Sequence, residues 1–192
     1  DPNLFGGGPD HRLSALLVGL KLGVFGILRF ALPLAPTAAR EYFWLMTVSG
    51  LIGLIYGALV ALRQSNLRKM LAFSSISHVG LVIVSLAAMN IQGVQGAVLQ
   101  LANFSIIAGG LMLMAGFLHH RLGSTDLASL GGLALPLPRL TALFLLLGMA
   151  SIGLPGTNGF IAELLMLLGI LQTAPIVAVL ALLGVILGAA YF

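Results

Sequence analysis

Long apolar runs, interrupted by few charges, constrain this chain more than any other feature of its sequence. About six of these runs approach the roughly 20 residues of α-helix that cross the ~30 Å hydrocarbon layer of a membrane. Hydrophobic residues make up 59% of the chain and charged residues only 7%, whereas a soluble domain carries roughly 25% charged residues. A single soluble core of 192 residues could not enclose so much apolar surface. The sequence therefore predicts an all-α, polytopic transmembrane helix bundle.

The connections between the predicted membrane elements are short, which makes each helix an antiparallel neighbour of the next. We predict an N-terminal segment on the cytoplasmic side, residues 1–12, followed by a transmembrane domain, residues 13–192. The predicted elements of that domain are residues 13–34, 42–62, 70–89, 94–118, 140–171 and 176–192.

Basic residues gather on one membrane side when successive spans alternate in direction. Arg40 is the exception on the other side. Because cytoplasmic loops carry an excess of lysine and arginine, we predict that the basic side is cytoplasmic. We expect a multi-pass membrane protein, located in the bacterial plasma membrane. The basic side holds Arg12, Arg63, Arg68, Lys69, Arg121 and Arg139.

The predicted element 140–171 is too long for a single straight span, since such a helix would measure about 48 Å. Pro155 and Gly156 lie in its middle with an apolar run on each side. Proline interrupts a helix, so we predict a discontinuous helix whose second half is capped by Thr157 or Asn158. The alternative is a helical hairpin with a tight Pro-Gly turn, whose arms of about 15 residues are too short to span. Broken helices lie at ion sites in transporters.

Two ionisable side chains lie deep in the predicted spans. Lys21 is ~13 Å into the first span, where a lysine costs ~2.5–3.5 kcal/mol on insertion scales. We expect it to face the bundle and to function there, with snorkelling to the interface as the alternative. Glu163 is the single carboxylate within a predicted span. A buried carboxyl group that can be neutral or ionised suits a proton relay, and a structural hydrogen bond is the alternative.

Neutral polar residues follow the same spans. Ser74, His78 and Ser85 form one polar stripe of a helix. His78 either relays protons or only bonds a neighbouring serine. Gln100 and Asn103, spaced i, i+3, either line a channel or join helices.

Several classes of site are excluded by the composition. The chain contains no cysteine, which excludes disulfides, thiolate-held iron–sulfur clusters and Cys-type zinc sites. Its net charge of +4 is spread over single loop residues and is not a nucleic-acid-binding patch. We expect no cofactor, no metal and no nucleic-acid partner. His119 and His120 are expected to be solvated in a loop.

Several motifs in order along the chain resemble one family. The chain is similar, over about residues 13 to 175, to the antiporter-like membrane subunits of respiratory complex I (NADH–quinone oxidoreductase), and most of all to the chain M (chain 4) type. Subunits of multi-chain cation/proton antiporters and membrane-bound hydrogenases are close relatives. The matching segments are residues 19–23 (GLKLG) with 28–30 (LRF), 67–80 (LRKMLAFSSISHVG), 96–100 (GAVLQ), 131–134 (GGLA) and 151–163 (SIGLPGTNGFIAE).

The resemblance implies roles for particular residues. Lys21 matches a proton-relay lysine near the midplane, Glu163 the acidic residue on a broken helix, and His78 a histidine of the serine-rich helix. The family's helices form two inverted repeats, each with one broken helix. This chain would hold one helix of the first repeat and the five helices of the second.

The function implied is that of a proton-translocating membrane-arm subunit, with redox chemistry in other chains. Its partners would be the other membrane-arm subunits and the lipid bilayer. Two alternatives stay open: a subunit of a sodium/proton antiporter or membrane-bound hydrogenase, and a structural membrane subunit that conducts nothing.

The chain departs from the family's pattern in two ways. The family usually has a histidine where this chain has Phe104, so water, Asn103 or Ser105 substitutes for it, or the channel is impaired. The first half-channel of the family has no counterpart here. We therefore expect a C-terminal-half fragment of a longer subunit, or a divergent protein that needs a partner.

Overall fold

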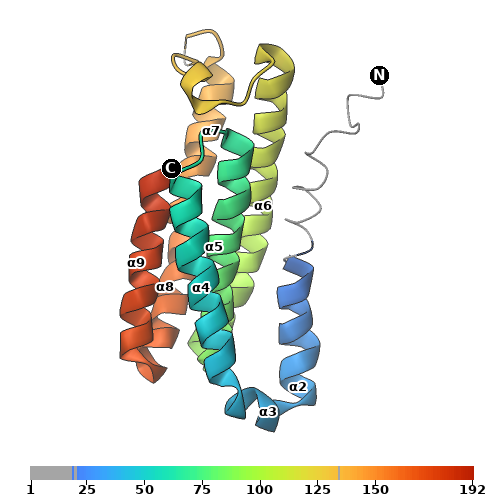
Figure 1. Cartoon of the computed structure of the whole chain (residues 1–192), viewed down its shortest axis with the longest axis vertical. Helices are drawn as coiled ribbons and strands as arrows, with labels where there is room; N and C mark the ends of the chain where they lie inside the picture. The colour runs from blue at the N-terminus through green and yellow to red at the C-terminus, as the bar shows by residue number, and fades with distance from the viewer. Residues whose placement is uncertain (1–18, 20, 134) are drawn as a thin grey trace.

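The computed structural model describes residue 19, residues 21–133 and residues 135–192. The predicted N-terminal segment 1–12 and residues 13–18 and 20 of the first predicted span lie outside the described residues. Every named element within the described part is a helix, and the long helices stand roughly side by side in an elongated bundle (Figure 1). The all-α prediction is confirmed.

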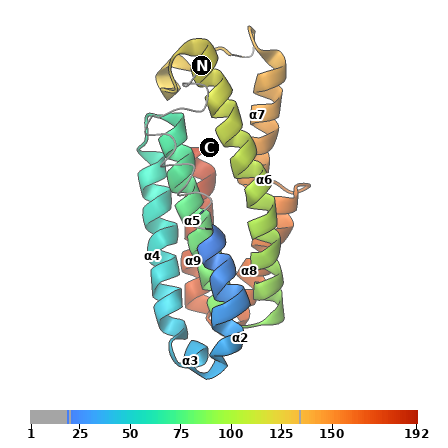
Figure 2. The same cartoon turned by 90° about the vertical axis from the view of Figure 1, so that its right-hand side faces the viewer.

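The first helix is irregular. Residues 21–26 are α-helical, and the same helix continues as the π-helical stretch η1 (Ile27–Ala31) and the short α2 (Leu32–Leu34). It stands beside the bundle and is followed by α3 (Pro36–Glu41), a short helix where the sequence predicted a connection (Figures 1 and 2).

Three helices are each long and apolar enough to cross a membrane: α4 (Phe43–Leu62), α5 (Leu67–Ala87) and α6 (Ile91–Leu122). Shorter apolar helices follow a loop that contains the 3₁₀ turn η2 (Leu127–Ser129). They are α7 (Pro138–Ser151), α8 (Asn158–Thr173) and α9 (Pro175–Tyr191).

Helix α5 is the centre of the bundle and is far more buried than α4 or α6. It packs most extensively on α4 and also contacts α6, α8 and α9. Close approach is possible because Gly80 of α5 lies directly against the backbone of Gly50 and Leu54. Small residues at such crossings let helices associate in a membrane, where burial of apolar surface gives little driving force.

Large apolar side chains cover the outside of the bundle. Examples are Ile52 on α4, Ile106 on α6, Leu145 on α7 and Ile176 on α9, all more than half exposed. A soluble protein rarely exposes such large apolar patches. The surface is that of a multi-pass membrane protein.

The helix that the sequence predicted to be discontinuous is broken. Helix α7 ends at Ser151, α8 begins at Asn158, and the two lie one above the other along the bundle (Figure 2). The hairpin alternative is therefore wrong. Thr157 occupies the cap position of α8 but makes no side-chain cap bond. Its hydroxyl instead donates to the carbonyl oxygen of Leu154 at 2.8 Å, which corrects the predicted cap.

Helix α6 is longer than the predicted span 94–118. Asn90 extends it at the start by accepting from the backbone N–H of Gly93 at 2.7 Å. Gly123, with φ of 71°, ends it in a left-handed cap. His119 and His120 therefore lie in the last helical turn, not in a loop, and both are exposed.

The basic residues of the connections in the described part lie at the two ends of the bundle, as the sequence predicted. The α4–α5 loop, the end of α6 and the start of α7 share one end, whereas α3 with Arg40 lies at the other (Figure 1). At the basic end, Leu67 N–H donates to Thr125 O at 2.9 Å and Leu127 N–H to Ser65 O at 2.8 Å. These bonds join the α4–α5 loop to the α6–α7 loop. Which end faces the cytoplasm stays a prediction.

Candidate functional site

The break between α7 and α8 brings a backbone carbonyl and a carboxylate to one histidine of α5. Ser151 ends α7, so its carbonyl oxygen is free of the regular helical bond. That oxygen lies 3.3 Å from Nε2 of His78. Glu163, on α8, places Oε1 3.9 Å from the same nitrogen. His78 and Glu163, 85 positions apart in the sequence, thus form a pair inside the bundle.

Both ring nitrogens of His78 face oxygen atoms. Nδ1 lies 2.8 Å from the carbonyl oxygen of Ser74, and Nε2 faces Ser151 O and the Glu163 carboxyl group. Carbonyl oxygens only accept hydrogen bonds. A neutral imidazole donates from one nitrogen, whereas an imidazolium donates from both. Each ring nitrogen of His78 therefore faces an oxygen atom that can accept a hydrogen bond from it.

A glycine makes room for the carboxyl group. Gly153 lies in the break with φ of 71°, and a Cβ atom there would collide with Glu163 Oε2. Positive φ is also a conformation that glycine adopts without strain. Gly153 therefore allows the chain to turn and leaves space for the carboxyl group of Glu163.

A small cavity adjoins the pair between α4, α5, α8, α9 and the break. Its free volume is about 10 Å³, which is close to the room that one water molecule needs. Its lining includes His78, Ser151, Glu163 and Ser77. The Ser151 hydroxyl is buried without a hydrogen-bond partner in the described structure, and a buried polar group of this kind is a natural partner for water.

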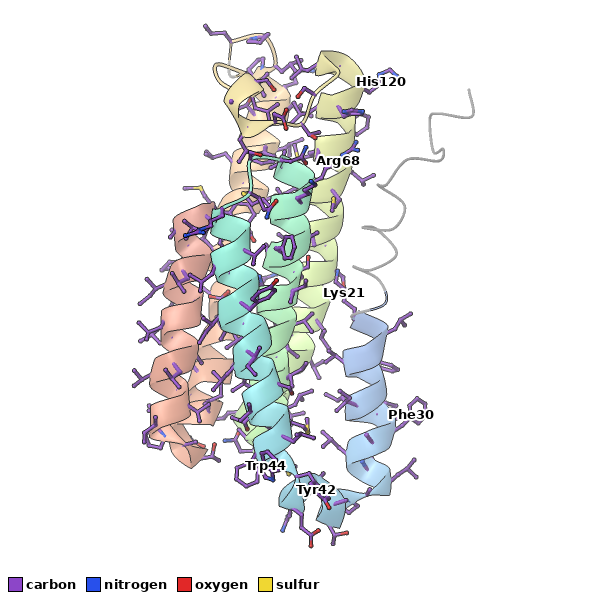
Figure 3. All side chains as sticks on the ribbon, in the orientation of Figure 1. Lys21, Phe30, Tyr42, Trp44, Arg68 and His120 are labelled. Carbon is purple, nitrogen blue, oxygen red and sulfur yellow. The ribbon has the colours of Figure 1, made fainter. Side chains whose placement is uncertain are left out.

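Phe104 of α6 contacts both Lys21 and His78. Lys21 Nζ donates to the carbonyl oxygen of Phe104 at 3.4 Å and lies 5.4 Å from the centre of the Phe104 ring. The His78 ring stacks on Phe104, with centroids 4.4 Å apart. Figure 3 shows Lys21 near the start of the described part of the first helix, next to α6. The pairwise contacts thus run in a row from Lys21 to Phe104, to His78 and to Glu163.

Other predicted channel residues fall into two groups. Ser85 is buried and donates to Gly93 O at 2.9 Å, so its hydroxyl joins α5 to α6. Gln100 and Asn103 are also buried, yet Gln100 Oε1 and Asn103 Nδ2 have no partner in the described residues. Ser105, one candidate substitute for the missing histidine, is exposed and donates to Leu101 O at 2.7 Å. It therefore does not replace that histidine.

Sequence reasoning did not single out Ser151, Gly153, Ser77 or Tyr191 as parts of the site. The break itself was a signal for the first two, because unwinding frees carbonyl groups and demands glycine. Ser77 donates to Leu54 O at 2.9 Å, and the buried Tyr191 hydroxyl at the end of α9 lies near Ser74 and Glu163. Neither had a signal in the sequence. Among the described residues there is also no cluster of three or more metal-ligand side chains.

Comparison with known proteins shows the family of the chain. The family described as NADH:quinone oxidoreductase/Mrp antiporter, transmembrane, matches residues 7–188. NADH-quinone oxidoreductase subunit M of Rickettsia bellii (strain RML369-C) is 43% identical over 180 residues. That alignment covers 93% of this chain and 36% of the relative. The chain thus spans about a third of the length of the curated relatives that it matches.

Two solved assemblies contain chains with a similar fold. One is respiratory complex I from Thermus thermophilus with bound NADH, with a TM-score of 0.85 and 38% identity, covering 88% of this chain and 36% of that one. The other is the Mrp complex from Dietzia sp. DQ12-45-1b, with a TM-score of 0.83 and 26% identity, covering 89% and 32%.

Proposed function

We propose a proton-conducting role for this chain, which belongs to the NADH:quinone oxidoreductase/Mrp antiporter transmembrane family. The protein acts as a membrane-arm subunit of an NADH–quinone oxidoreductase-like translocase. Redox chemistry takes place in other subunits, and this chain moves protons. Its partners are the neighbouring membrane-arm subunits and the lipid bilayer.

One observation carries the proposal: a carboxyl group and a histidine meet inside an apolar bundle, at the break of a helix. His78 Nε2 and Glu163 Oε1 are 3.9 Å apart. Ionisable side chains are costly in a membrane and mark proton and ion pathways there. Unwound backbone at membrane depth belongs beside protein or a wet cavity, and the cavity next to Glu163 meets that requirement.

The geometry supports a proton transfer between these two groups. A separation of 3.9 Å exceeds a hydrogen bond, so the transfer runs through one water molecule or follows a small rotation of the carboxyl group. Ser74 O and Ser151 O hold the imidazole while it carries the second proton. When the proton leaves Nε2, Glu163 accepts it. Lys21 is a second proton-carrying group on the far side of Phe104.

A sodium/proton antiporter subunit is the second candidate. It is supported by the likeness to the Mrp complex, and the carboxylate and carbonyl oxygens beside the break are ligands that a hard cation accepts. A structural subunit that only seals the membrane is a third, supported by the apolar Phe104 in the row.

The substitution Glu163→Gln tests the proposal. Glutamine keeps the shape and hydrogen bonding of the side chain but cannot titrate. In the complete complex, assayed in native membrane vesicles with NADH as electron donor, we expect Glu163→Gln to abolish or strongly reduce proton uptake. Glu163→Asp should reduce it less. Glu41→Gln, on the exposed α3, is the matched control and should leave proton uptake unchanged.

Lys21→Ala extends the same assay to the other end of the row. It should lower proton uptake while assembly is kept, because removal of a buried cation eases insertion. Lys69→Ala, at an exposed position of the basic end, is its control. Uptake equal to wild type in assembled Glu163→Gln complex refutes the relay and leaves the sealing role. Sodium-dependent uptake without NADH would favour the antiporter.

A further inference from the structure

We propose that Phe104 is an apolar barrier that separates Lys21 from the His78–Glu163 pair and prevents direct proton exchange between them. This inference rests on the proposed function and adds a control point to it. The proton path then consists of two compartments, with Lys21 in one and the pair in the other.

Contacts of one ring with both groups carry the argument. Lys21 Nζ lies 5.4 Å from the ring centre, and the His78 ring lies 4.4 Å away, stacked at an interplanar angle of 21°. Phe104 is only 5% exposed, so its ring is closely packed where it contacts both groups. A phenyl ring has neither a proton to donate nor a lone pair to accept one. A proton on Lys21 therefore has no direct bonded route to His78.

The backbone of Phe104 also holds Lys21 in place. The Phe104 carbonyl oxygen accepts from Lys21 Nζ at 3.4 Å. The ammonium is also attracted by the electron-rich face of the ring. Phe104 thus positions Lys21 with its carbonyl group, and its side chain obstructs proton exchange between Lys21 and His78.

The cavity of the site lies on one side of the barrier. Its lining contains His78, Glu163 and Ser151 but neither Lys21 nor Phe104. Water in this cavity reaches the pair without reaching Lys21. The cavity therefore serves the His78–Glu163 compartment only.

Two amides offer a way around the ring once it moves. Gln100 lies one helical turn before Phe104, and Asn103 directly precedes it. Gln100 Oε1 and Asn103 Nδ2 are buried without partners in the described residues, and such groups favour water when space allows. A rotation of the ring would let water bridge Lys21 and His78 beside these amides. Rotation of the Phe104 side chain alone would then open the barrier.

The barrier does not prevent electrostatic interaction between Lys21 and His78. Cations that contact the same ring repel each other through a medium of low dielectric constant. A proton on His78 therefore disfavours the positive charge of Lys21 without a proton passing between them. The ring separates the protons but not the charges.

The experiment measures the passive proton leak of vesicles that contain the complete complex, with no electron donor present. Phe104→His places a group that transfers protons in the row, and Phe104→Leu keeps an apolar side chain as the matched control. We expect about a tenfold or greater rise in proton leak for Phe104→His, since a positioned proton-transfer group changes rates by ~10²–10⁴. The proton leak of Phe104→Leu should stay within about twofold of the wild-type leak, which is small beside the change expected for histidine.

A second variant and a double mutant complete the test. Phe104→Asn also supplies hydrogen-bonding groups and should raise the leak if the histidine variant fails to assemble. Adding Glu163→Gln to Phe104→His should return the leak to the wild-type value, because the new path runs through Glu163. If the histidine and asparagine variants leak no more than the leucine variant, the barrier is refuted. The NADH-driven uptake of Glu163→Gln judges the proposed function separately, because Phe104 is unchanged in that variant.

Discussion

At the scale of single residues, the site depends on Gly153 as much as on the ionisable groups. The carboxyl group of Glu163 occupies the space into which a side chain at position 153 would grow. A polar group inside an apolar bundle must be held in position by its neighbours, since solvent is not there to compensate for a displacement. The glycine therefore determines where Glu163 meets His78.

Gly153→Ala should impair proton transfer more than Gly156→Ala. Both positions have positive φ, 71° and 101°, but a Cβ at Gly156 meets nothing within 4 Å. Each alanine therefore carries backbone strain of about 1–3 kcal/mol, and only the one at 153 displaces Glu163. NADH-driven proton uptake at matched subunit content is the measurement. Equal uptake by the two variants would mean that Glu163 tolerates displacement.

The ionisable residues of the site could be predicted from the sequence, but their arrangement could not. Lys21 and Glu163 stand out because charge is rare in apolar runs, and His78 belongs to a polar stripe. The position of Phe104 between Lys21 and His78 depends on how the first helix, α5 and α6 pack. The role of Ser151 depends on its backbone carbonyl, which every residue possesses. Such contacts leave no periodic pattern in the sequence.

At the scale of elements, the pairing of α4 and α5 is the tightest in the described fold. Gly80 touches the backbone of Leu54 and Gly50, and Gly57 lies against Ser77 of α5. His78 follows Ser77 directly. The glycine contacts therefore hold the site histidine at its depth in the bundle.

Gly80→Ala should destabilise the bundle, because its Cβ would overlap the backbone of α4. Overpacking of this kind costs roughly 1–3 kcal/mol. Gly109→Ala on α6 is the control, since a Cβ there meets nothing within 4 Å and alanine is the better helix former by about 1 kcal/mol. The melting temperature of the complex in detergent measures the difference. A Gly80→Ala complex as stable as the Gly109→Ala complex would show that α4 can shift to make room.

Elements were predictable where local chemistry forces them. Pro155 and the excessive length of residues 140–171 predicted the break, and α7 and α8 confirm it. The π-helical stretch η1 and the extension of α6 beyond residue 118 were not predicted. Hydropathy marks the apolar part of a helix, whereas polar residues such as His119 continue it into the interface. The end of α6 is set by Gly123 and not by loss of hydropathy.

At the scale of the whole molecule, the bundle has one basic end and one end with little positive charge. The loops at the basic end are joined by the bonds between residues 65–67 and 125–127. Transmembrane proteins keep loops rich in lysine and arginine on the cytoplasmic side. The arrangement of the loops thus predicts which end of the bundle faces the cytoplasm.

Cysteines introduced at Ser65 and Thr37 should report opposite sides of the membrane. Both positions are exposed and lie at opposite ends of the bundle, and this chain has no cysteine of its own. With a membrane-impermeant maleimide, Ser65→Cys should be labelled from the cytoplasmic side only, in inside-out vesicles. Thr37→Cys should be labelled only from the opposite side, in intact cells whose outer envelope layers have been removed. Labelling of both in detergent controls for reactivity. The reverse pattern would invert the orientation, because it would place the basic loops outside against the charge bias.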